Sequence, residues 1–462
     1  MEKTKDKIEV KDVIQVDHEL LDNISDLVKK RASSTLLTLF ADLHPADIAE
    51  IINHIGTPNA EYLFDLLDTE TASEVITEID ENLREKLLSN IEAEKISDII
   101  DELETDDATD IVSELPEEVA EQVLQQMDAE DSEDVKELLK YEEDTAGGIM
   151  SSDFVYVRDD ETIRAAIKAV RNNAEHFEQI YHVYVLNHDD VLVGIVPLKE
   201  LLINPLRTKI TSVMEEDLIY VTPDVDQEEV ANLMKKYDLV AIPVVNENKV
   251  MLGRITIDDI VDVIQEEADE DLQKMAGLSE EQESSDSIFR ISKIRLPWLI
   301  VALVIELVNV IVLSSYEQVL AQVTIAVFFF PVVMAMGGSS GNQAAIVMVK
   351  GLSSGELWMK GSLKKLLKEL FVAVLNGIVI ASILFIITYF FFGKDKIYFL
   401  MILSFSLIVI IIFATMLGAT IPLILKKIGA DPAVATGPFV STMNDIFGLL
   451  LYMTFVTLFL IN

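Results

Sequence analysis

Five long apolar segments fill the C-terminal part of the chain and restrict its fold more than any other feature. They are residues 297–313, 319–349, 366–392, 398–425 and 432–460. The core of a bilayer offers no water to backbone N–H and C=O groups, and about 20 apolar residues suffice to cross it as a helix. The sequence therefore predicts an integral membrane protein with five transmembrane helices. In the second segment, Pro331 and the run MGGSSGNQ (336–343) predict a kink or a break.

The last apolar segment contains a single charged residue, Asp445. A helix rises about 1.5 Å per residue, so a helix that begins at Pro432 places Asp445 roughly 20 Å along it, close to the middle of the bilayer. A carboxylate there is costly unless it faces a cation or a wet cavity. Because no Lys or Arg occurs in the middle of any apolar segment, and Lys368 lies at the start of the third, we favour a cation site on a permeation path. The simpler alternative is a carboxylate that a neighbouring helix holds by hydrogen bonds.

The net charge is divided unevenly between the two halves of the chain. Residues 1–289 hold 24 Lys and Arg against 72 Asp and Glu, a balance of −48, whereas residues 290–462 hold 12 against 7. We do not expect nucleic acid as a partner, because phosphate binding needs the opposite sign. The acidic half is either a solvated surface or a sensor of divalent cations, which take oxygen ligands. The absence of cysteine excludes disulfides and Cys-ligated zinc.

The distribution of positive charge around the apolar segments predicts their orientation. Ten basic residues fall on one side, namely Arg290, Lys293, Arg295, Lys350, Lys360, Lys364, Lys365, Lys368, Lys426 and Lys427. Only Lys394 and Lys396 fall on the other side. Since basic loops stay in the cytoplasm, we expect cytoplasmic N-terminal domains, an extracellular C-terminus and a plasma-membrane location.

An internal repeat runs through residues 43–139. Blocks that begin at Leu43, Ile55, Leu67, Ile79, Ile91, Leu103, Leu115 and Met127 are 12 positions apart. Within most blocks, apolar residues recur at offsets 0, 5, 8 and 9, and the last three offsets share one helical face. The repeat predicts a stack of short helices, a small solenoid in which neighbours cover each other's apolar faces.

Two α/β modules follow the repeat. Residues 154–203 have the order strand, helix, strand, strand, helix, and residues 218–265 repeat it. This arrangement resembles a tandem pair of CBS domains. In that family a Thr-x-x-Asp motif after the last strand often contacts an adenine nucleotide such as ATP or AMP, and the second copy has it as Thr256 and Asp259. The first copy has Pro197 and Glu200 there, so the resemblance implies at most one nucleotide site per chain.

The helix that leaves the second module is densely acidic, with eight carboxylates between residues 258 and 271. Like charges three or four positions apart destabilise a helix, so something should offset them. The two readings are a solvated charged face and bound Mg²⁺, and we favour Mg²⁺.

The order of these parts resembles the MgtE family of magnesium transporters over essentially the whole chain. The specific motifs are YEEDTAGGIM (141–150), PVVMAMGGSSGNQ (331–343) and DPAVATGPFVSTMNDIFGL (431–449). The implied fold is a multi-domain integral membrane protein with an all-α superhelical N domain, an α/β tandem CBS pair and an α-helical membrane domain with five transmembrane helices. The implied boundaries are an acidic N domain at 1–140, CBS domains at 141–210 and 211–265, a connecting helix and linker at 266–294, and a transmembrane domain at 295–462.

The resemblance also implies a function and a set of metal-binding residues. It implies a homodimeric Mg²⁺-selective channel that admits Mg²⁺ and is closed by cytosolic Mg²⁺, with Asp445 as the cation site of the pore. The residues that match the family's gating carboxylates are Asp259, Asp262, Glu267, Glu270 and Asp271. Further candidates are Asp106, Asp107 and Asp110 in the N domain, and Glu215, Asp217 and Asp226 in or near the second CBS copy.

Some alternatives stay open on the sequence alone. Mg²⁺ efflux, or transport of Co²⁺ or Mn²⁺, would fit the same fold. An enzyme regulated by a CBS pair is disfavoured, because the sequence shows no nucleophile–base set and no cofactor loop. A chloride channel is disfavoured, because the predicted pore has a carboxylate and no basic residue. Glu306, in the first apolar segment, is outside the family pattern. It could face the pore, pair with Asn309 or lie near the outer interface.

Overall fold

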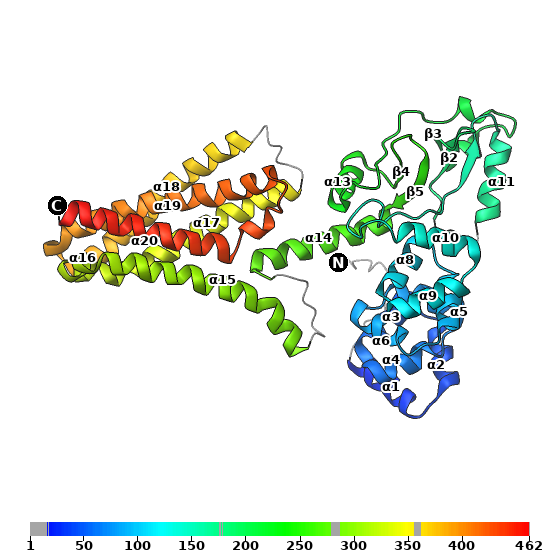
Figure 1. Cartoon of the computed structure of the whole chain (residues 1–462), viewed down its shortest axis with the longest axis horizontal. Helices are drawn as coiled ribbons and strands as arrows, with labels where there is room; N and C mark the ends of the chain where they lie inside the picture. The colour runs from blue at the N-terminus through cyan, green and yellow to red at the C-terminus, as the bar shows by residue number, and fades with distance from the viewer. Residues whose placement is uncertain are drawn as a thin grey trace, which may run out of the picture. The chain divides into compact units, whose positions relative to one another are not determined.

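The computed structural model describes residues 16, 18–174, 177, 179–278, 287–354 and 362–461, and Figure 1 shows the order of the elements. The chain divides into two compact units, Met1–Val261 and Asp262–Asn462. Residues 1–15, residues 279–286 of the predicted linker and Lys360 lie outside the described residues. The predicted fold class is confirmed: a multi-domain membrane protein with a helical array, a small α/β part and five long apolar helices.

The first unit begins with short helices whose starting points repeat every 12 residues. The helices α1 (His18–Lys29) and α2 (Ser33–Phe40) precede the repeat. The repeat itself consists of α3 (Pro45–Ile55), α4 (Thr57–Phe64), α5 (Thr69–Thr77), α6 (Glu81–Leu88), α7 (Ala93–Ile100), α8 (Thr105–Glu114), α9 (Glu117–Gln126) and α10 (Ala129–Leu138). Pro45 and Pro58 lie in first turns, where a missing N–H costs little. The predicted period is therefore confirmed.

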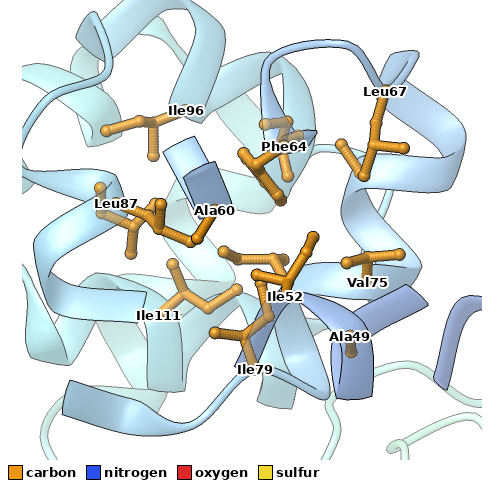
Figure 2. Close-up of a cluster of buried hydrophobic side chains, with 14 of the residues drawn as sticks. Ala49, Ile52, Ala60, Phe64, Leu67, Val75, Ile79, Leu87, Ile96 and Ile111 are labelled. Carbon is orange, nitrogen blue, oxygen red and sulfur yellow. The ribbon is translucent and has the colours of Figure 1, made fainter. Parts of the chain in front are cut away.

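The apolar positions of the repeat meet in one core, part of which Figure 2 shows. Ile52, Leu63 and Ile96 are fully buried in it. Alternate helices pack on each other, α3 on α5, α5 on α7 and α7 on α9. Helices of two to three turns are marginal alone, so their stability comes from this stacking. The stack in turn fixes the direction of the polar first turn of α8.

The α/β part contains both predicted copies, the second without its first strand. The first copy consists of β1 (Tyr156–Arg158), α11 (Ile163–Asn173), β2 (His182–Leu186), β3 (Leu192–Pro197) and α12 (Leu198–Ile203). Its strand β2 pairs parallel with β1 and antiparallel with β3. After a 3₁₀ turn, η1 (Ile210–Ser212), the second copy consists of α13 (Gln227–Tyr237), the antiparallel pair β4 (Ala241–Val245) and β5 (Met251–Thr256), and the start of α14 (Ile257–Ala276).

The strand expected at residues 218–221 is wrong as a full strand. The described chain forms only an isolated parallel bridge there, between Val221 and Val244. Pro223, two positions later, has no N–H to donate to a neighbouring strand. The pairing therefore ends after Val221.

Five helices of the second unit are long and apolar enough to cross a membrane. They are α15 (Ile288–Ser315), α17 (Phe330–Ser353), α18 (Ser362–Phe392), α19 (Ile397–Lys427) and α20 (Pro438–Leu460). Short pieces connect them: α16 (Glu317–Gln322), η2 (Thr324–Phe329), η4 (Lys394–Lys396) and η5 (Ala433–Ala435). Helix α19 packs against α17, α18 and α20, and α15 packs against α20.

Two details of the membrane helices differ from expectation. The second apolar segment is broken, as expected, into α16, η2 and α17, and Pro331 lies in the first turn of α17. The run 336–343, however, lies inside the continuous helix α17 and is not the place of the break. Glycine and serine lower helix stability in water, but in a bilayer the helix is the conformation that satisfies the backbone. The last helix begins at Pro438 and not at Pro432. Asp445 therefore lies roughly 10 Å along α20, in its first half, and not at the centre of the span.

Glycines of the run 336–343 allow α17 to approach α19 closely. A methyl group on Gly418 of α19 would overlap the carbonyl oxygen of Gly341 of α17. Small residues let membrane helices come together in this way. The same glycine-rich part of α17 also packs against α20, where Gly338 lies beside Asp445.

Candidate functional site

Carboxylates of the first unit gather around a small cavity between the helical array and the second α/β copy. Glu104 precedes α8, and Asp106 and Asp107 lie in its first turn, where the helix dipole favours negative charge. Asp258 and Asp259 lie in the first turn of α14. The cavity has a volume of about 30 Å³, enough for one or two water-sized ligands, and the other residues that line it are Gln179, Arg254 and Thr256.

The cavity is held together by Arg254, which is buried in β5. Its guanidinium donates to Glu104 Oε2 at 2.7 Å, to the carbonyl of Asp153 at 2.7 Å and to the carbonyl of Gln179 at 2.9 Å. The Asp153 carboxylate accepts from Thr105 N at 3.0 Å. A buried charge needs such saturation by hydrogen bonds. These contacts fix the start of α8 on the α/β part.

Asp106 has an unfavourable electrostatic environment within the cluster. Burial, and then the charges of Asp107 and Asp259, raise the pKa of its carboxyl well above the usual range. Its Oδ1 is buried and has no hydrogen-bond partner among the described residues. The positive charge of Arg254 is paired with Glu104. The remaining carboxylates of the cluster therefore keep an excess of negative charge.

Asp259 is better satisfied than Asp106. Its Oδ2 accepts from the Thr256 hydroxyl at 2.8 Å and from the Thr256 N–H at 3.2 Å. Burial nevertheless raises its pKa, because it outweighs these hydrogen bonds. Carboxylate oxygens that repel one another in a small cavity can hold a hard divalent cation, whose charge would remove the repulsion.

The same Thr256–Asp259 pair is the motif that the sequence linked to nucleotide binding. In the first copy, Glu200 instead accepts a hydrogen bond from the Asn204 side chain at 2.9 Å. The structure thus contains the hydroxyl–carboxylate pair in the second copy, and a different contact at the matching place in the first.

The other predicted carboxylates of the first unit lie outside this cavity. Asp110 is exposed, and its charge acts on Arg84. Glu215 and Asp217 are exposed. Asp226 caps α13 by accepting from Glu228 N at 3.0 Å. None of these four is among the residues that line the cavity.

A second group of carboxylates lies in the second unit, at the end of α14. The Lys274 ammonium is 2.5 Å from Glu270 Oε1 and 2.7 Å from Asp431 Oδ2. These two carboxylates raise the Lys274 pKa against the opposing effect of burial. Since Asp431 belongs to the loop before α20, the lysine ties α14 to that loop.

Two further contacts join α14 to the membrane helices. Asp271 hydrogen-bonds with Ser353 at the end of α17, although burial still raises its pKa. A side chain at Gly437 would overlap the Met275 carbonyl oxygen, and the positive φ of +57° there also favours glycine. Asp262 and Glu267 lie on exposed and half-buried positions of α14 respectively.

The third position is Asp445, in the membrane. It is half-buried in α20, and a methyl group on Gly338 of α17 would lie 3.9 Å from Asp445 Oδ1. The Asp445 carboxyl group also lies within hydrogen-bonding distance of the Glu306 carboxyl group of α15. Glu306 in turn accepts from Asn309 Nδ2 at 2.8 Å. Of the three placements that the sequence left open for Glu306, the structure contains the Asn309 pair and adds the contact with Asp445.

Sequence reasoning did not single out Glu104, Arg254, Lys274 or Asp431. Arg254 did carry a signal, because it is a charged residue at a strand position where the first copy has Ile195. Lys274 is the basic residue at the end of an acidic helix. The partners of both residues come from distant parts of the sequence, so the pairs themselves have no local signature.

Comparisons with known proteins agree with this organisation. The MgtE family, described as a divalent cation transporter, matches residues 330–455. The MgtE intracellular N domain matches residues 43–144, and CBS domains match 146–206 and 210–266.

Several similar proteins cover most of the chain. Magnesium transporter MgtE of Thermus thermophilus is 33% identical over 333 residues, which are 70% of this chain and 72% of that protein. Magnesium transporter MgtE of Bacillus subtilis is 35% identical over 323 residues, which are 70% of this chain and 71% of that protein. The crystal structure of the cytosolic domain of the Mg²⁺ channel MgtE in complex with ATP is 28% identical, with a TM-score of 0.50, and covers 53% of this chain and 99% of that one.

The profile matches follow the same order as the parts of the structure, from the helical array through the paired α/β modules to the membrane helices. The full-length relatives extend this agreement over more than two thirds of their own length. This chain belongs to the MgtE family of divalent cation transporters.

Proposed function

We propose that this protein is a Mg²⁺-selective channel for Mg²⁺ uptake, and that cytosolic Mg²⁺ closes it by binding to the acidic soluble domains. The observation that carries the proposal is the Asp445 carboxylate, which lies within an apolar membrane helix beside glycines of α17. The relatives named magnesium transporters support the choice of ion. Mg²⁺ gives up its water reluctantly, so a carboxylate that attracts a largely hydrated ion suits it.

The assembly we propose is a homodimer with the pore between two membrane halves. One Asp445 from each subunit, with backbone carbonyls near residues 437–441, then faces the ion. We propose cytoplasmic soluble domains and a C-terminus outside the plasma membrane, because basic loops tend to stay in the cytoplasm. Mg²⁺ efflux, or transport of Co²⁺ or Mn²⁺ on the same fold, is the alternative function.

The closing mechanism we propose begins with the carboxylate balance of −48 in residues 1–289. When cytosolic Mg²⁺ is high, ions bound at the Asp106–Asp259 cavity and along α14 remove the repulsion between carboxylates. Asp262, Glu267, Glu270 and Asp271 are the α14 residues in this role. The linking helix then stays docked at the loop before α20 and closes the pore. Mg²⁺ can drive this change only if it binds the closed state more tightly.

A nucleotide site in the second CBS copy is a further part of the proposal. The Thr256–Asp259 pair and the ATP complex of the similar cytosolic domain support it. We expect calorimetry on the soluble half to give one ATP or AMP bound per chain. Thr256→Ala should weaken binding by about tenfold, the equivalent of about 1.4 kcal/mol. Glu200→Gln, at the matching place of the first copy, should leave it unchanged. Equal binding by Thr256→Ala and wild type would place the nucleotide elsewhere.

Asp445→Ala and Asp445→Asn should abolish Mg²⁺ flux into proteoliposomes and leave the protein folded. The alanine removes the group that attracts the ion, and the amide cannot replace its charge. Asp395→Asn, on the exposed connection η4, is the matched control and should keep wild-type flux. Wild-type flux through a well-folded Asp445→Ala protein would refute the role of this residue in the pore.

Asp106 should make the stability of the soluble half depend on pH and on Mg²⁺. Its folded-state pKa lies above the unfolded value of about 3.9, so the folded state binds more protons, and stability should rise as the pH falls from neutrality. In a chelator, Asp106→Asn should unfold at a higher temperature than wild type, with a weaker pH dependence and a smaller gain from added Mg²⁺. Glu215→Gln is the exposed control. If both variants show the same pH dependence, Asp106 is not the destabilised group.

The double variant Asp106→Asn, Asp259→Asn should keep Mg²⁺ flux and lose part of its inhibition by internal Mg²⁺. A site with a tenfold preference for the closed state contributes about 1.4 kcal/mol to closing. Loss of the cavity site should therefore raise the inhibiting concentration several-fold. The exposed pair Glu215→Gln, Asp217→Asn is the control. Patch recording with graded internal Mg²⁺ measures the difference, and identical inhibition in both double variants would exclude the cavity as a sensor.

A further inference from the structure

The membrane unit contains a second carboxylate beside Asp445. Glu306 lies inside the apolar helix α15, which packs against α20. The two carboxylates are hydrogen-bonding neighbours within one chain. No Lys, Arg or His pairs with either of them in the described part of the chain. Two carboxyl groups this close together offer up to four oxygens, the type of ligand that hard divalent cations take.

Asn309 gives an independent indication that a ligand belongs there. It lies one turn from Glu306 on α15, and only 4% of its surface is exposed. Its Nδ2 donates to Glu306 Oε2 at 2.8 Å, so the amide is directed at the carboxylate pair. Its Oδ1 is buried without a hydrogen-bond partner among the described residues.

The orientation of the amide does not remove this deficit. If its nitrogen and oxygen were exchanged, the oxygen would face a carboxylate and the nitrogen would be unpaired. An unpaired polar atom in a membrane is costly. A bound cation, or a water that the cation holds, would supply the missing partner of Oδ1.

We propose that Glu306 and Asp445 of one subunit form a two-carboxylate site for the permeating divalent cation, with Asn309 Oδ1 as a third oxygen. The proposal rests on the proposed function and deepens it. Asp445 alone would attract a hydrated ion, whereas two carboxylates and an amide oxygen can replace part of the water shell. Such direct ligation suits Mn²⁺ better than Mg²⁺, because carboxylate and carbonyl oxygens suit both ions but Mg²⁺ gives up its water more reluctantly. Glu306 is then the residue that raises the affinity of the pore and extends its selectivity to Mn²⁺.

The test compares Mg²⁺ and Mn²⁺ flux in proteoliposomes across three variants of the full chain. Glu306→Gln should raise the half-saturating Mg²⁺ concentration by about tenfold, should keep the maximal Mg²⁺ flux, and should lower the ratio of Mn²⁺ to Mg²⁺ flux. Asn309→Ala should shift both quantities in the same direction by a smaller factor. Glu317→Gln, an exposed residue of α16, is the matched control and should behave as wild type.

The outcomes separate this inference from the proposed function. If Glu306→Gln has the half-saturation and the ion ratio of Glu317→Gln, the carboxylate pair is not an ion site, even where Asp445→Ala is inactive as proposed. If Glu306→Gln does not fold, Asn309→Ala decides, and control-like values for it overturn the inference. A wild type that carries no Mg²⁺, or an active Asp445→Ala, would instead refute the proposed function itself.

Discussion

Repulsion between carboxylates held close together is the interaction on which this structure depends. At the Asp106–Asp259 cavity, burial and like charge both raise the carboxyl pKa, and one oxygen has no partner among the described residues. At Glu306 and Asp445, two carboxylates share a contact in an apolar environment. Such groups are destabilising, and other interactions must offset them, since the net free energy of unfolding is only about 5–15 kcal/mol. The helical stack and the close-packed membrane helices provide rigid supports that keep these carboxylates from moving apart.

At the end of α14, a lysine offsets the repulsion between carboxylates. There the Lys274 ammonium lies between Glu270 and Asp431, so a side chain supplies the cation. The pair is partly buried and contributes to holding α14 against the loop before α20. A lysine is always present, whereas a bound ion is present only in proportion to its concentration. If the carboxylate sites bind Mg²⁺ as we propose, the protein contains both a fixed and an exchangeable version of one electrostatic contact.

Much of this architecture follows from local sequence patterns. The 12-residue period, the order of the α/β copies and the five spans depend on apolar spacing and chain length, which are visible along the sequence. The second span breaks near Pro331 as expected, but the run 336–343 stays helical, because the low helix preference of glycine and serine in water does not carry over to a membrane helix. The expected start of the last span at Pro432 failed because η5 and Gly437, with its positive φ, precede the helix.

The sites were harder to predict because they depend on pairs that are distant in sequence. Asp106 and Asp259 could be named as carboxylates of interest, but their charge coupling arises from the way α8 and the start of α14 meet. Asp110 lies one turn from Asp106, but it is exposed and its charge acts on Arg84. Helical spacing alone could not show that Asp106 lines the cavity and Asp110 does not. The contact of Glu306 with Asp445 required knowing that α15 packs on α20.

The fixed and the exchangeable contacts have different consequences for a switch. A lysine bridge stabilises the docked position of α14 by the same amount at every Mg²⁺ concentration. It therefore sets how strongly closure is favoured when no Mg²⁺ is bound. Sites made of carboxylates alone add stabilisation only as the ion concentration rises. If each site prefers the closed state tenfold, it contributes about 1.4 kcal/mol, and a change from mostly open to mostly closed needs about 5.5 kcal/mol. About four exchangeable sites are then needed whatever the lysine bridge contributes, because a constant contribution shifts the starting ratio of open to closed and not the ion-dependent change. In the mechanism that we propose, the strength of the Lys274 bridge would thereby determine the Mg²⁺ concentration at which the acidic domains close the channel.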